Sequence, residues 1–448
     1  MMPSENDNPA NKTGVQLGFS VEFDDDDHRM MAGHNLPLWQ DWDGGQIGGK
    51  PSWLNPKDIP KHHLVCKCCE DPLVFVCQLY CPCDDINPNA FHRSFYVFAC
   101  PNIECAKETT GTIRVIRTQL PAINPYLPEE EDDECWAMHI PKAWDVNLCK
   151  VCGQRGNGKC PVQGEYFCGR HHQKEYKKYA FDVRKDTSTE GSDSCFMPSV
   201  LTSSELVVEE EPPIGNDDKS DAKARNTMFK AGNIEDNDSD EEFDRNLEQG
   251  DLNDMTGAGP ETVTKDTVTM NFFDRINKIT NVNTQCLRYL RWPDEERSRE
   301  TASPLWIRSD YTPNEENISQ CEKCGAERRF EFQLMPQMLH YLLKDHQRKN
   351  KEKSQNLISK KDTEAVRAAS NILEQAPPEQ VPPDLATTTE KAMEAARAKI
   401  MEESNKVPSW GCVAVYTCTA SCDVMDATED DELGAYIEEF TWKQPSLD

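Results

Sequence analysis

Residues 93–105 read RSFYVFACPNIEC, a run of β-branched and aromatic residues that ends in a pair of cysteines. Residues 66–69 read CKCC and contain another cysteine pair. Aromatic and β-branched residues favour strands, and two separated cysteine pairs can supply the four thiolates of one tetrahedral zinc site. We therefore predict a β-rich segment stabilised by a zinc site. Its predicted ligands are Cys66, Cys69, Cys100 and Cys105.

The same order of elements occurs again near the end of the sequence. Residues 321–324 read CEKC, and residues 413–422 read VAVYTCTASC. In each copy, a Pro-x-Trp segment precedes the first cysteine pair and a Gln-Leu dipeptide follows it. Ordered elements that recur in one chain indicate an internal duplication. We predict two pseudo-repeat β modules, each with a four-cysteine zinc site. The ligands of the second site are Cys321, Cys324, Cys418 and Cys422.

A third cysteine-rich segment lies between the two copies. Residues 149–152 read CKVC, and residues 166–173 read YFCGRHHQ. One tetrahedral zinc site is closed by Cys149, Cys152, Cys168 and His172. Cys160 is a further candidate ligand, and His171 could replace His172. The segment resembles a MYND finger that lacks the residues for a second zinc, so we predict a small, degenerate finger over residues 148–182.

Other cysteines near the first site leave its ligand set open. Cys81 and Cys83 could replace one of its pairs as ligands. Cys68 and Cys77 fit buried small side chains or free thiols instead.

Composition limits which kinds of partner and which cellular compartments are expected. The 448 residues carry a formal net charge of -30, and 37% of them are hydrophobic. Such a charge attracts basic partners and repels nucleic acid and anionic membranes. The sequence shows no apolar signal segment, so we interpret its 20 cysteines as metal ligands before disulfides. No run of about 18 apolar residues is present, and no membrane span is predicted.

We predict an α+β, β-rich fold in several parts. These are an N-terminal β module at 15–125, the finger at 148–182, a disordered acidic linker at 183–266, and a C-terminal β module at 268–445 with a flexible insertion at 344–406. The linker is rich in Ser, Asp, Glu, Asn and Gly, so it cannot bury enough apolar surface to offset its ordering entropy.

We do not expect an enzyme. The sequence contains no phosphate-binding Gly-rich loop with Lys, no HExxH and no GxSxG motif. Each proposed zinc site has four protein ligands and no open position, which is typical of structural zinc.

Longer motifs resemble one known family. Residues 91–98 read FHRSFYVF and residues 330–337 read FEFQLMPQ, and both resemble the programmed cell death protein 2 family, as does the finger between two halves. The resemblance covers about 15–182, 268–343 and 407–445. It implies a chaperone that binds a newly made basic protein of the small ribosomal subunit and supports ribosome biogenesis.

Two alternatives stay open. The resemblance also implies a nuclear zinc-finger protein linked to programmed cell death, acting as an adaptor that binds Pro-rich peptides through the finger or as a DNA-binding regulator. Direct nucleic-acid binding would need a basic face. The basic runs at 174–178 and 348–361 have few aromatic neighbours, so we do not expect it. We expect the protein in the cytoplasm and the nucleus.

Overall fold

A computed structural model describes most of both predicted modules and the finger. The described residues are 14–22, 45–126, 146–183, 197–211, 267–277, 285–292, 303–349, 407–423 and 432–447. The predicted insertion from residue 350 onward and most of the predicted linker lie outside the described residues.

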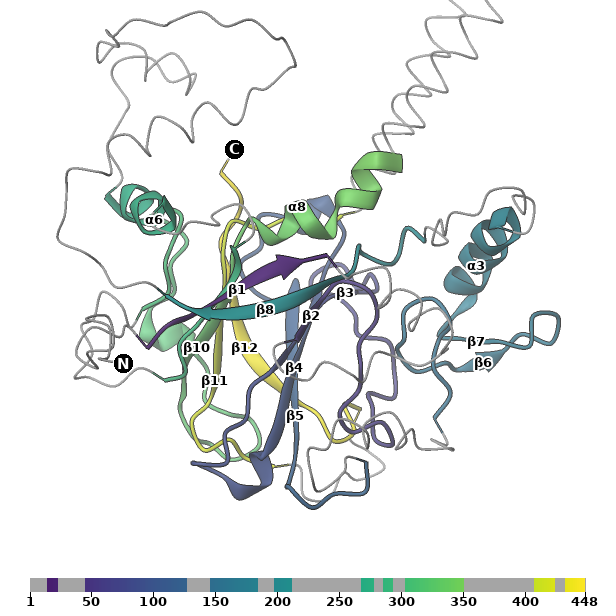
Figure 1. Ribbon diagram of the computed structural model, residues 1–448, viewed down its shortest axis with the longest axis horizontal. Helices are drawn as coiled ribbons and strands as arrows, with labels where there is room; N and C mark the ends of the chain where they lie inside the picture. The colour runs from purple at the N-terminus through teal and green to yellow at the C-terminus, as the bar shows by residue number, and fades with distance from the viewer. Residues whose placement is uncertain are drawn as a thin grey trace, which may run out of the picture.

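Ten antiparallel strands close into one barrel (Figure 1). Six come from the N-terminal half: β1 (Gln16–Val21), β2 (Gly45–Ile47), β3 (Val74–Tyr80), β4 (His92–Ala99), β5 (Ile113–Leu120) and β8 (Ser204–Glu210). Four come from the C-terminal half: β9 (Gln285–Tyr289), β10 (Arg328–Leu334), β11 (Val413–Cys418) and β12 (Ile437–Lys443). The order around the barrel is β1-β8-β2-β3-β4-β5-β12-β11-β10-β9.

The two halves of the chain contribute to a single sheet. Strand β5 pairs with β12, with Arg117 opposite Ile437. Strand β1 pairs with β9, with Gln16 opposite Tyr289, and this pairing closes the barrel. The two β modules expected from the sequence therefore do not form two separate sheets. Closure removes sheet edges, whose backbone groups would otherwise lack partners.

Strand β4 is buried on both faces and contains a continuous apolar run. All eight of its residues are buried. Phe95 and Val97 point into the barrel core, while Tyr96 and Phe98 pack outside it against Trp53. Side chains alternate between the two faces of a strand. A continuous apolar run therefore results where both faces are covered.

One part of the predicted linker is a barrel strand. The sequence predicts disorder over residues 183–266, and this is wrong for residues 197–211, which contain β8. Leu201 and Leu206 are buried in the barrel core, and the hydroxyl of Ser204 lies 2.8 Å from that of Ser20 on β1. The average composition of a long acidic stretch concealed this short apolar pattern.

The helices labelled among the described residues lie outside the barrel (Figure 1). They include α3 (Arg170–Val183), α6 (Thr267–Asn277) and α8 (Met338–Leu342). In α6, Phe272 and Ile276 are buried, and α8 begins four residues after Leu334, which ends β10. None of the described helices is long and apolar enough to cross a membrane.

The finger contains a small hairpin and a helix at one side of the barrel (Figure 1). Its strands are β6 (Gly158–Lys159) and β7 (Tyr166–Phe167), and α3 follows them. The indole of Trp53 donates a 2.8 Å hydrogen bond to the carbonyl of Gly153, and the ammonium of Lys50 donates to the carbonyl of Lys150 at 2.6 Å. The Pro-x-Trp segment of the first half thus connects the finger to the barrel.

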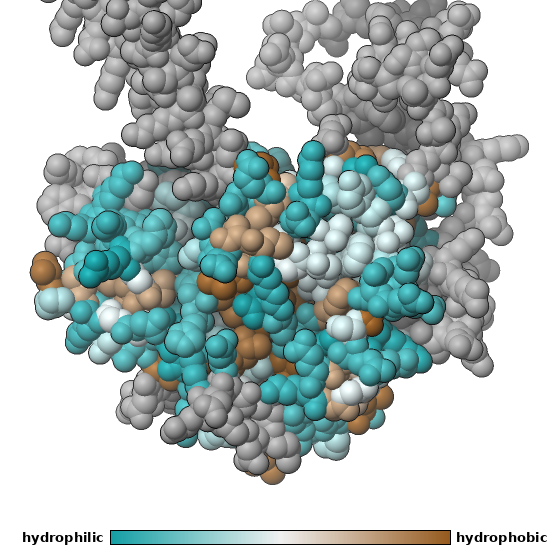
Figure 2. All heavy atoms as spheres, turned by 180° about the vertical axis from the view of Figure 1, so that it is seen from behind, coloured by the Kyte–Doolittle hydropathy of each residue, from teal (hydrophilic) through white to brown (hydrophobic). Residues whose placement is uncertain are grey.

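Figure 2 shows the opposite face of the molecule. Hydrophilic side chains cover most of it, and hydrophobic ones form small groups between them. The apolar residues are mainly inside, in the barrel core and in the layer around Trp53.

Candidate metal centres

The first cysteine group forms where β3 begins and β4 ends. Val74 at the start of β3 lies opposite Ala99 at the end of β4, which brings the two predicted cysteine pairs together. The ligand atoms of all four residues lie within 4.8 Å of one another: Cys66, Cys69, Cys100 and Cys105. The Sγ atoms of Cys69 and Cys100 are 3.6 Å apart. The predicted first set is therefore assembled in the fold.

The second group occupies the corresponding place in the other half. Strand β10 pairs with β11 so that Arg328 lies opposite Cys418. The structure brings together Cys321, Cys324, Cys418 and Cys422, again within 4.8 Å of one another. Cys321 and Cys422 are 3.6 Å apart at Sγ, and Cys324 and Cys418 are 3.5 Å apart. The long insertion between β10 and β11 does not separate these cysteine pairs.

The third group lies in the finger. The Nδ1 atom of His172 is 3.0 Å from Sγ of Cys168 and 3.6 Å from Sγ of Cys149, and Cys152 lies 3.8 Å from Cys168 at Sγ. His172, at the start of α3, therefore faces the cysteines. The alternative, His171, is exposed and contacts Glu175 instead.

His63 also reaches this third group. It lies within 4.8 Å of Cys152, Cys168 and His172. Both of its ring nitrogens have other partners, the carbonyl of Leu64 at 3.0 Å and the amide of Gln154 at 3.1 Å. Burial lowers the pKa of His63 to about 4, so the ring is neutral. Cys149 is the better fourth donor, and His63 packs over the site.

Several other cysteines do not join these groups. Cys160 is buried in the finger core, but it belongs to none of the groups found among the described residues. Cys77 and Cys83 are fully buried, and Cys81 lines a cavity at one end of the barrel. Cys68 is exposed and donates to the carbonyl of Thr110.

The donor chemistry of the three groups fits a soft metal ion. In each group one thiol has a lowered pKa. Although burial opposes ionisation of Cys66, the backbone amides of Cys69 and Cys68 lower its pKa. Hydrogen bonding from Cys422 lowers the pKa of Cys418 to about 4, and Cys152 similarly lowers that of Cys149. Thiolate and imidazole donors without carboxylates favour Zn²⁺ over Mg²⁺ or Ca²⁺. Each group can therefore hold a metal ion.

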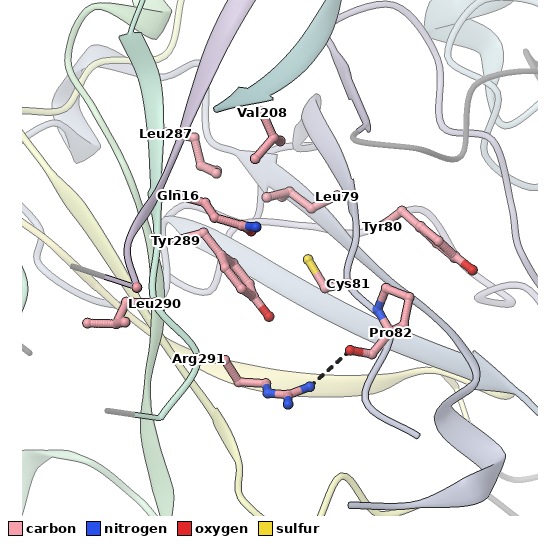
Figure 3. Close-up of a pocket in the computed structure, with 11 residues that line it drawn as sticks. Gln16, Leu79, Tyr80, Cys81, Pro82, Val208, Leu287, Tyr289, Leu290 and Arg291 are labelled. Atoms are coloured by element: carbon pink, nitrogen blue, oxygen red, sulfur yellow. Dashed lines mark hydrogen bonds between the residues drawn. The ribbon is translucent and has the colours of Figure 1, made fainter. Parts of the chain in front are cut away.

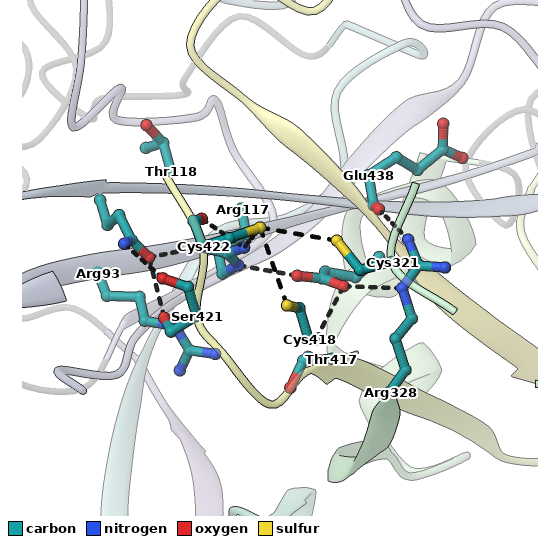
Figure 4. A network of polar contacts seen from close by, with 12 residues as sticks. Arg93, Arg117, Thr118, Cys321, Arg328, Thr417, Cys418, Ser421, Cys422 and Glu438 are labelled. Carbon is teal, nitrogen blue, oxygen red and sulfur yellow. Dashed lines mark hydrogen bonds and ion pairs between the residues drawn. The ribbon is translucent and has the colours of Figure 1, made fainter. Parts of the chain in front are cut away.

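A buried network surrounds the second group (Figure 4). Arg117 on β5 donates to the carboxylate of Glu439 at 2.8 Å and to the carbonyl of Cys422 at 3.0 Å. Glu439 also accepts from the backbone amide of Cys418 at 3.2 Å and from Arg328 at 3.1 Å. The side chains of Arg117 and Glu439 are fully buried. The N-terminal half thus fixes the loop that carries the last two cysteines.

A second buried ion pair lies inside the barrel. The guanidinium of Arg93 on β4 makes two hydrogen bonds to Glu331 on β10, at 2.6 and 2.8 Å. Tyr289 donates to the same carboxylate at 2.9 Å, and Thr417 also donates to it. Burial alone would raise the pKa of Glu331, but the charge and hydrogen bonds of Arg93 hold it below its usual value.

Sequence reasoning missed these supporting residues. Nothing in the spacing of Arg93, Arg117 or Glu331 distinguishes them from exposed charges on a strand. The weak signal available was that each lies in a run that is otherwise predicted to be buried. The sequence around His63 does not indicate that it lies near a metal site, because that site is formed by residues about 90 positions later.

The barrel and its three thiol-rich groups define a cysteine-rich β-barrel protein with candidate metal centres. Two family models match the sequence of the chain, one in each half. The N-terminal domain of programmed cell death protein 2 matches residues 14–134, and its C-terminal putative domain matches residues 266–445. The chain belongs to the programmed cell death protein 2 family.

Individual relatives align along most of the chain. Programmed cell death protein 2 of Mus musculus is 25% identical, over 97% of each chain. The Bos taurus protein is also 25% identical, over 90% of this chain and 91% of its own. Programmed cell death protein 2-like of Homo sapiens is 24% identical, over 67% of this chain and 79% of its own. No solved structure matches the chain.

Proposed function

We propose that this protein is a zinc-stabilised chaperone or adaptor that binds a basic protein of the small ribosomal subunit and supports ribosome biogenesis. It acts by binding and not by catalysis, in the cytoplasm and the nucleus. The observation that carries the proposal is family membership over most of the chain together with the net charge of -30. An acidic surface attracts a basic partner and speeds its association.

Zinc would have a structural role at each of the three groups. Each group has four donors from the protein, which leaves no position for a substrate. The first and second groups also join segments far apart in the sequence, such as Cys324 and Cys418. A bound ion would hold these segments together and favour the folded barrel.

Equivalent contacts in the two halves support an origin by internal duplication. The side-chain carbonyl of Gln78 on β3 accepts a 2.9 Å hydrogen bond from the amide of Ser52 in the first Pro-x-Trp segment. That of Gln333 on β10 accepts a 2.7 Å bond from the amide of Leu305 in the second. The same side chain holds the same segment in each half, although both halves now share one barrel.

Co-purification with small-subunit proteins tests the proposal. The full-length tagged chain is incubated with the dissociated proteins of the small subunit at physiological salt, and bound proteins are identified by mass spectrometry. We expect one ribosomal protein to be enriched over a control bait of equal net charge. Equal recovery of all basic proteins on both baits would show only charge attraction and would contradict the proposal.

An adaptor that binds Pro-rich peptides through the finger is the second candidate. This candidate is supported by relatives named for programmed cell death and by the exposed ring of His171 on α3. His172→Asn, which removes a finger donor, discriminates between the two. The chaperone proposal expects the ribosomal partner to stay bound, whereas the adaptor proposal expects partner loss. Filter binding of DNA at physiological salt tests a nucleic-acid role.

A further inference from the structure

The finger covers the Pro-x-Trp segment of the first half. Gly153, directly after the finger's CKVC pair, accepts the indole hydrogen bond of Trp53 at its carbonyl. The two segments are in close contact, since a Cβ added at Gly153 would lie 3.0 Å from Cβ of Lys50 and 3.2 Å from Cδ of Pro51. Residues 51–54 are all buried. In this half, a turn from another module thus covers the tryptophan and accepts its N–H.

The second half holds its own Pro-x-Trp segment in an equivalent frame. The pairing of β3 with β4 shifts register after Phe75, and the pairing of β10 with β11 shifts register after Phe330. The glutamine that follows three residues later on each strand accepts a hydrogen bond from the segment in the same way. Trp306 therefore has the position in the second half that Trp53 has in the first.

Trp306 is less covered than Trp53. Pro304, Leu305 and Trp306 are each partly exposed. The ring packs against the layer that contains Phe330 and Tyr416. Within the part of the chain that the structure describes, its indole N–H has no hydrogen-bond acceptor. The second half thus presents an aromatic ring and a hydrogen-bond donor at a position where the first half binds the finger.

Helix α6 extends this surface with exposed apolar side chains. The hydroxyl of Thr269 donates a 2.9 Å hydrogen bond to the carbonyl of Ile307, next to Trp306. Phe273 follows Thr269 by one helical turn and so lies on the same side of α6. Phe273 is 45% exposed, and Met270, three residues before it, is 48% exposed.

Tyr311 adds a further exposed ring. Its carbonyl accepts a 2.7 Å hydrogen bond from the indole of Trp442, which packs in the same layer as Trp306, and the residue is 43% exposed. The guanidinium of Arg308 lies 5.0 Å from the centroid of the Tyr311 ring. This surface therefore already holds one guanidinium over an aromatic face, a favourable contact. We call the following residues the aromatic surface: Met270, Phe273, Trp306 and Tyr311.

Carboxylates lie close to the aromatic surface. Ile318 packs in the same layer as Trp306, and Glu315 and Glu316 precede it on a short 3-10 helix. Both glutamates are exposed, and neither forms an ion pair with another described residue. Their charges are available to a basic partner.

Three cations near the aromatic surface are already paired. Arg291 follows Leu290, which packs in the same layer as Trp306, but it points to the carbonyl of Pro82 in the other half (Figure 3). The three ion pairs are Arg275 with Glu211, Arg291 with Asp85, and Arg308 with Asp310. Because these charges are offset, the two unpaired glutamates set the sign of the local field.

We propose that the aromatic surface binds an arginine-bearing loop of the basic protein partner. A backbone carbonyl of that loop accepts the indole hydrogen bond of Trp306, as Gly153 does for Trp53. A guanidinium of the loop stacks on an exposed ring, and Glu315 and Glu316 attract its charge. The inference rests on the proposed function and assigns its binding surface.

Variants with matched controls test the assignment. Phe273→Lys removes an exposed ring and adds a positive charge, and Phe91→Lys does the same in the other half, where Phe91 is 40% exposed. Trp306→Phe keeps a ring but removes an N–H that has no acceptor among the described residues. Trp292→Phe removes one that donates to Thr417 at 2.8 Å. Circular dichroism melting of each full-length variant confirms that it folds.

Binding is measured with two kinds of probe. One is the ribosomal protein captured by the wild-type chain. The other is a fluorescein-labelled 12-residue peptide of alternating Arg and Ser, with a peptide of alternating Lys and Ser as its control of equal charge. The wild type should bind the Arg–Ser peptide more tightly, because a guanidinium stacks on aromatic faces and an ammonium is more strongly hydrated.

The expected changes differ between surface and control variants. Phe273→Lys should raise the Kd of the ribosomal protein and of the Arg–Ser peptide at least about tenfold. Trp306→Phe should raise both about threefold to tenfold, the effect of one hydrogen bond, and leave the melting temperature unchanged. Phe91→Lys should leave both Kd values within twofold. Trp292→Phe should lower the melting temperature but also leave the Kd values within twofold.

The outcomes separate this inference from the proposed function. If the wild type captures a ribosomal protein and Phe273→Lys binds it equally well, the aromatic surface is not the binding surface, while the chaperone role stands. If no ribosomal protein is captured, the chaperone role fails and the Arg–Ser peptide alone decides. Weaker peptide binding by Phe273→Lys than by Phe91→Lys then supports the aromatic surface, and equal binding or no binding overturns it.

Crosslinking identifies what covers the aromatic surface. A benzophenone side chain at position 273 should crosslink to the captured ribosomal protein, and excess Arg–Ser peptide should reduce the yield. Crosslinks only to another segment of this chain, or only to a second copy of it, would overturn the assignment.

Discussion

The ammonium nitrogen of Lys443 lies 2.9 Å from the carbonyl oxygen of Cys105. It donates equally to the carbonyl of Ala106, at 2.9 Å. Lys443 belongs to β12 in the C-terminal half, whereas Cys105 belongs to the cysteine group of the N-terminal half. Arg117 makes the reverse connection, from β5 to the carbonyl of Cys422 at 3.0 Å. The first and second cysteine groups are thus each supported by a basic side chain from the other half, across the β5–β12 pairing.

Lys443→Met should weaken metal binding at the first group. Methionine keeps the apolar stem but removes the two hydrogen bonds that fix the Cys105 loop. Loss of such supporting contacts costs about 10–100-fold in metal affinity. Competition with a chromophoric chelator should show one weakened site per chain, with the second group unchanged. Lys57→Met is the control, because Lys57 is exposed and lies outside the metal-ligand groups of the described residues. Equal metal affinities in wild type and Lys443→Met would contradict the supporting role.

Removing one cysteine ligand should remove one metal ion. Elemental analysis of the purified wild type should return about three zinc ions per chain, one for each four-donor group. Cys321→Ser should lower the value by about one, because three donors hold zinc less tightly than four. Cys412→Ala is the control, since Cys412 is fully buried and lies outside the groups formed by the described residues. An unchanged zinc content in Cys321→Ser would rule out the second group.

The sequence predicted local structure and the grouping of the cysteine pairs better than it predicted how the strands assemble. The apolar run that ends at Cys100 is a strand, and the cysteine pairs of the first and second groups come together as their spacing indicated. Strand β8 was missed because three apolar side chains in an acidic stretch give a weak signal. Its stability comes from pairing with the distant strand β1, where Gly18 lies opposite Val208. Such pairing depends on tertiary packing and leaves no local pattern.

The charged residues of the core could not be predicted from the sequence either. Arg93 and Glu331 are separated by 238 positions and have fully buried side chains. Charged residues in strands usually face solvent, since burial of an unpaired charge is costly. Only the barrel order, which brings β4 and β10 to the same interior, shows that they pair. The sequence predicted His172 as the ligand with His171 as the alternative, and only the position of α3 shows that His171 faces away from the cysteines.

The Arg93–Glu331 pair should tolerate joint removal better than single removal. Arg93→Met leaves the carboxylate of Glu331 buried and unpaired, and breaking such a pair costs about 3–5 kcal/mol. The double variant Arg93→Met with Glu331→Leu removes both charges and should be destabilised much less. Urea unfolding of the wild type, both single variants and the double variant at neutral pH gives the comparison. Additive losses in the double variant would mean that the two residues act independently.

The same pair predicts how stability depends on pH. The pKa of Glu331 is held below its ordinary value of 4.5 in the folded state. Its contribution is therefore fully present above that ordinary value and is lost as the pH falls through the lower, folded value. Between about pH 5 and about pH 3 the wild type should lose more unfolding free energy than the double variant. Both proteins lose bound metal in acid, so the difference between them isolates the ion pair. Parallel pH profiles would contradict the prediction.

Gly48 should be far less tolerant of exchange for alanine than an exposed glycine of the finger. Its φ angle is +63°, and a Cβ would lie 1.9 Å from the carbonyl oxygen of Thr202. Because that atom belongs to the backbone beside β8, the clash cannot be relieved by a side-chain rotation. Gly48→Ala should lower the unfolding free energy by about 1–3 kcal/mol or more. Gly158→Ala is the control, since nothing lies within 4 Å of its added Cβ. If both variants unfold at the wild-type urea concentration, Gly48 is not packed against the backbone beside β8.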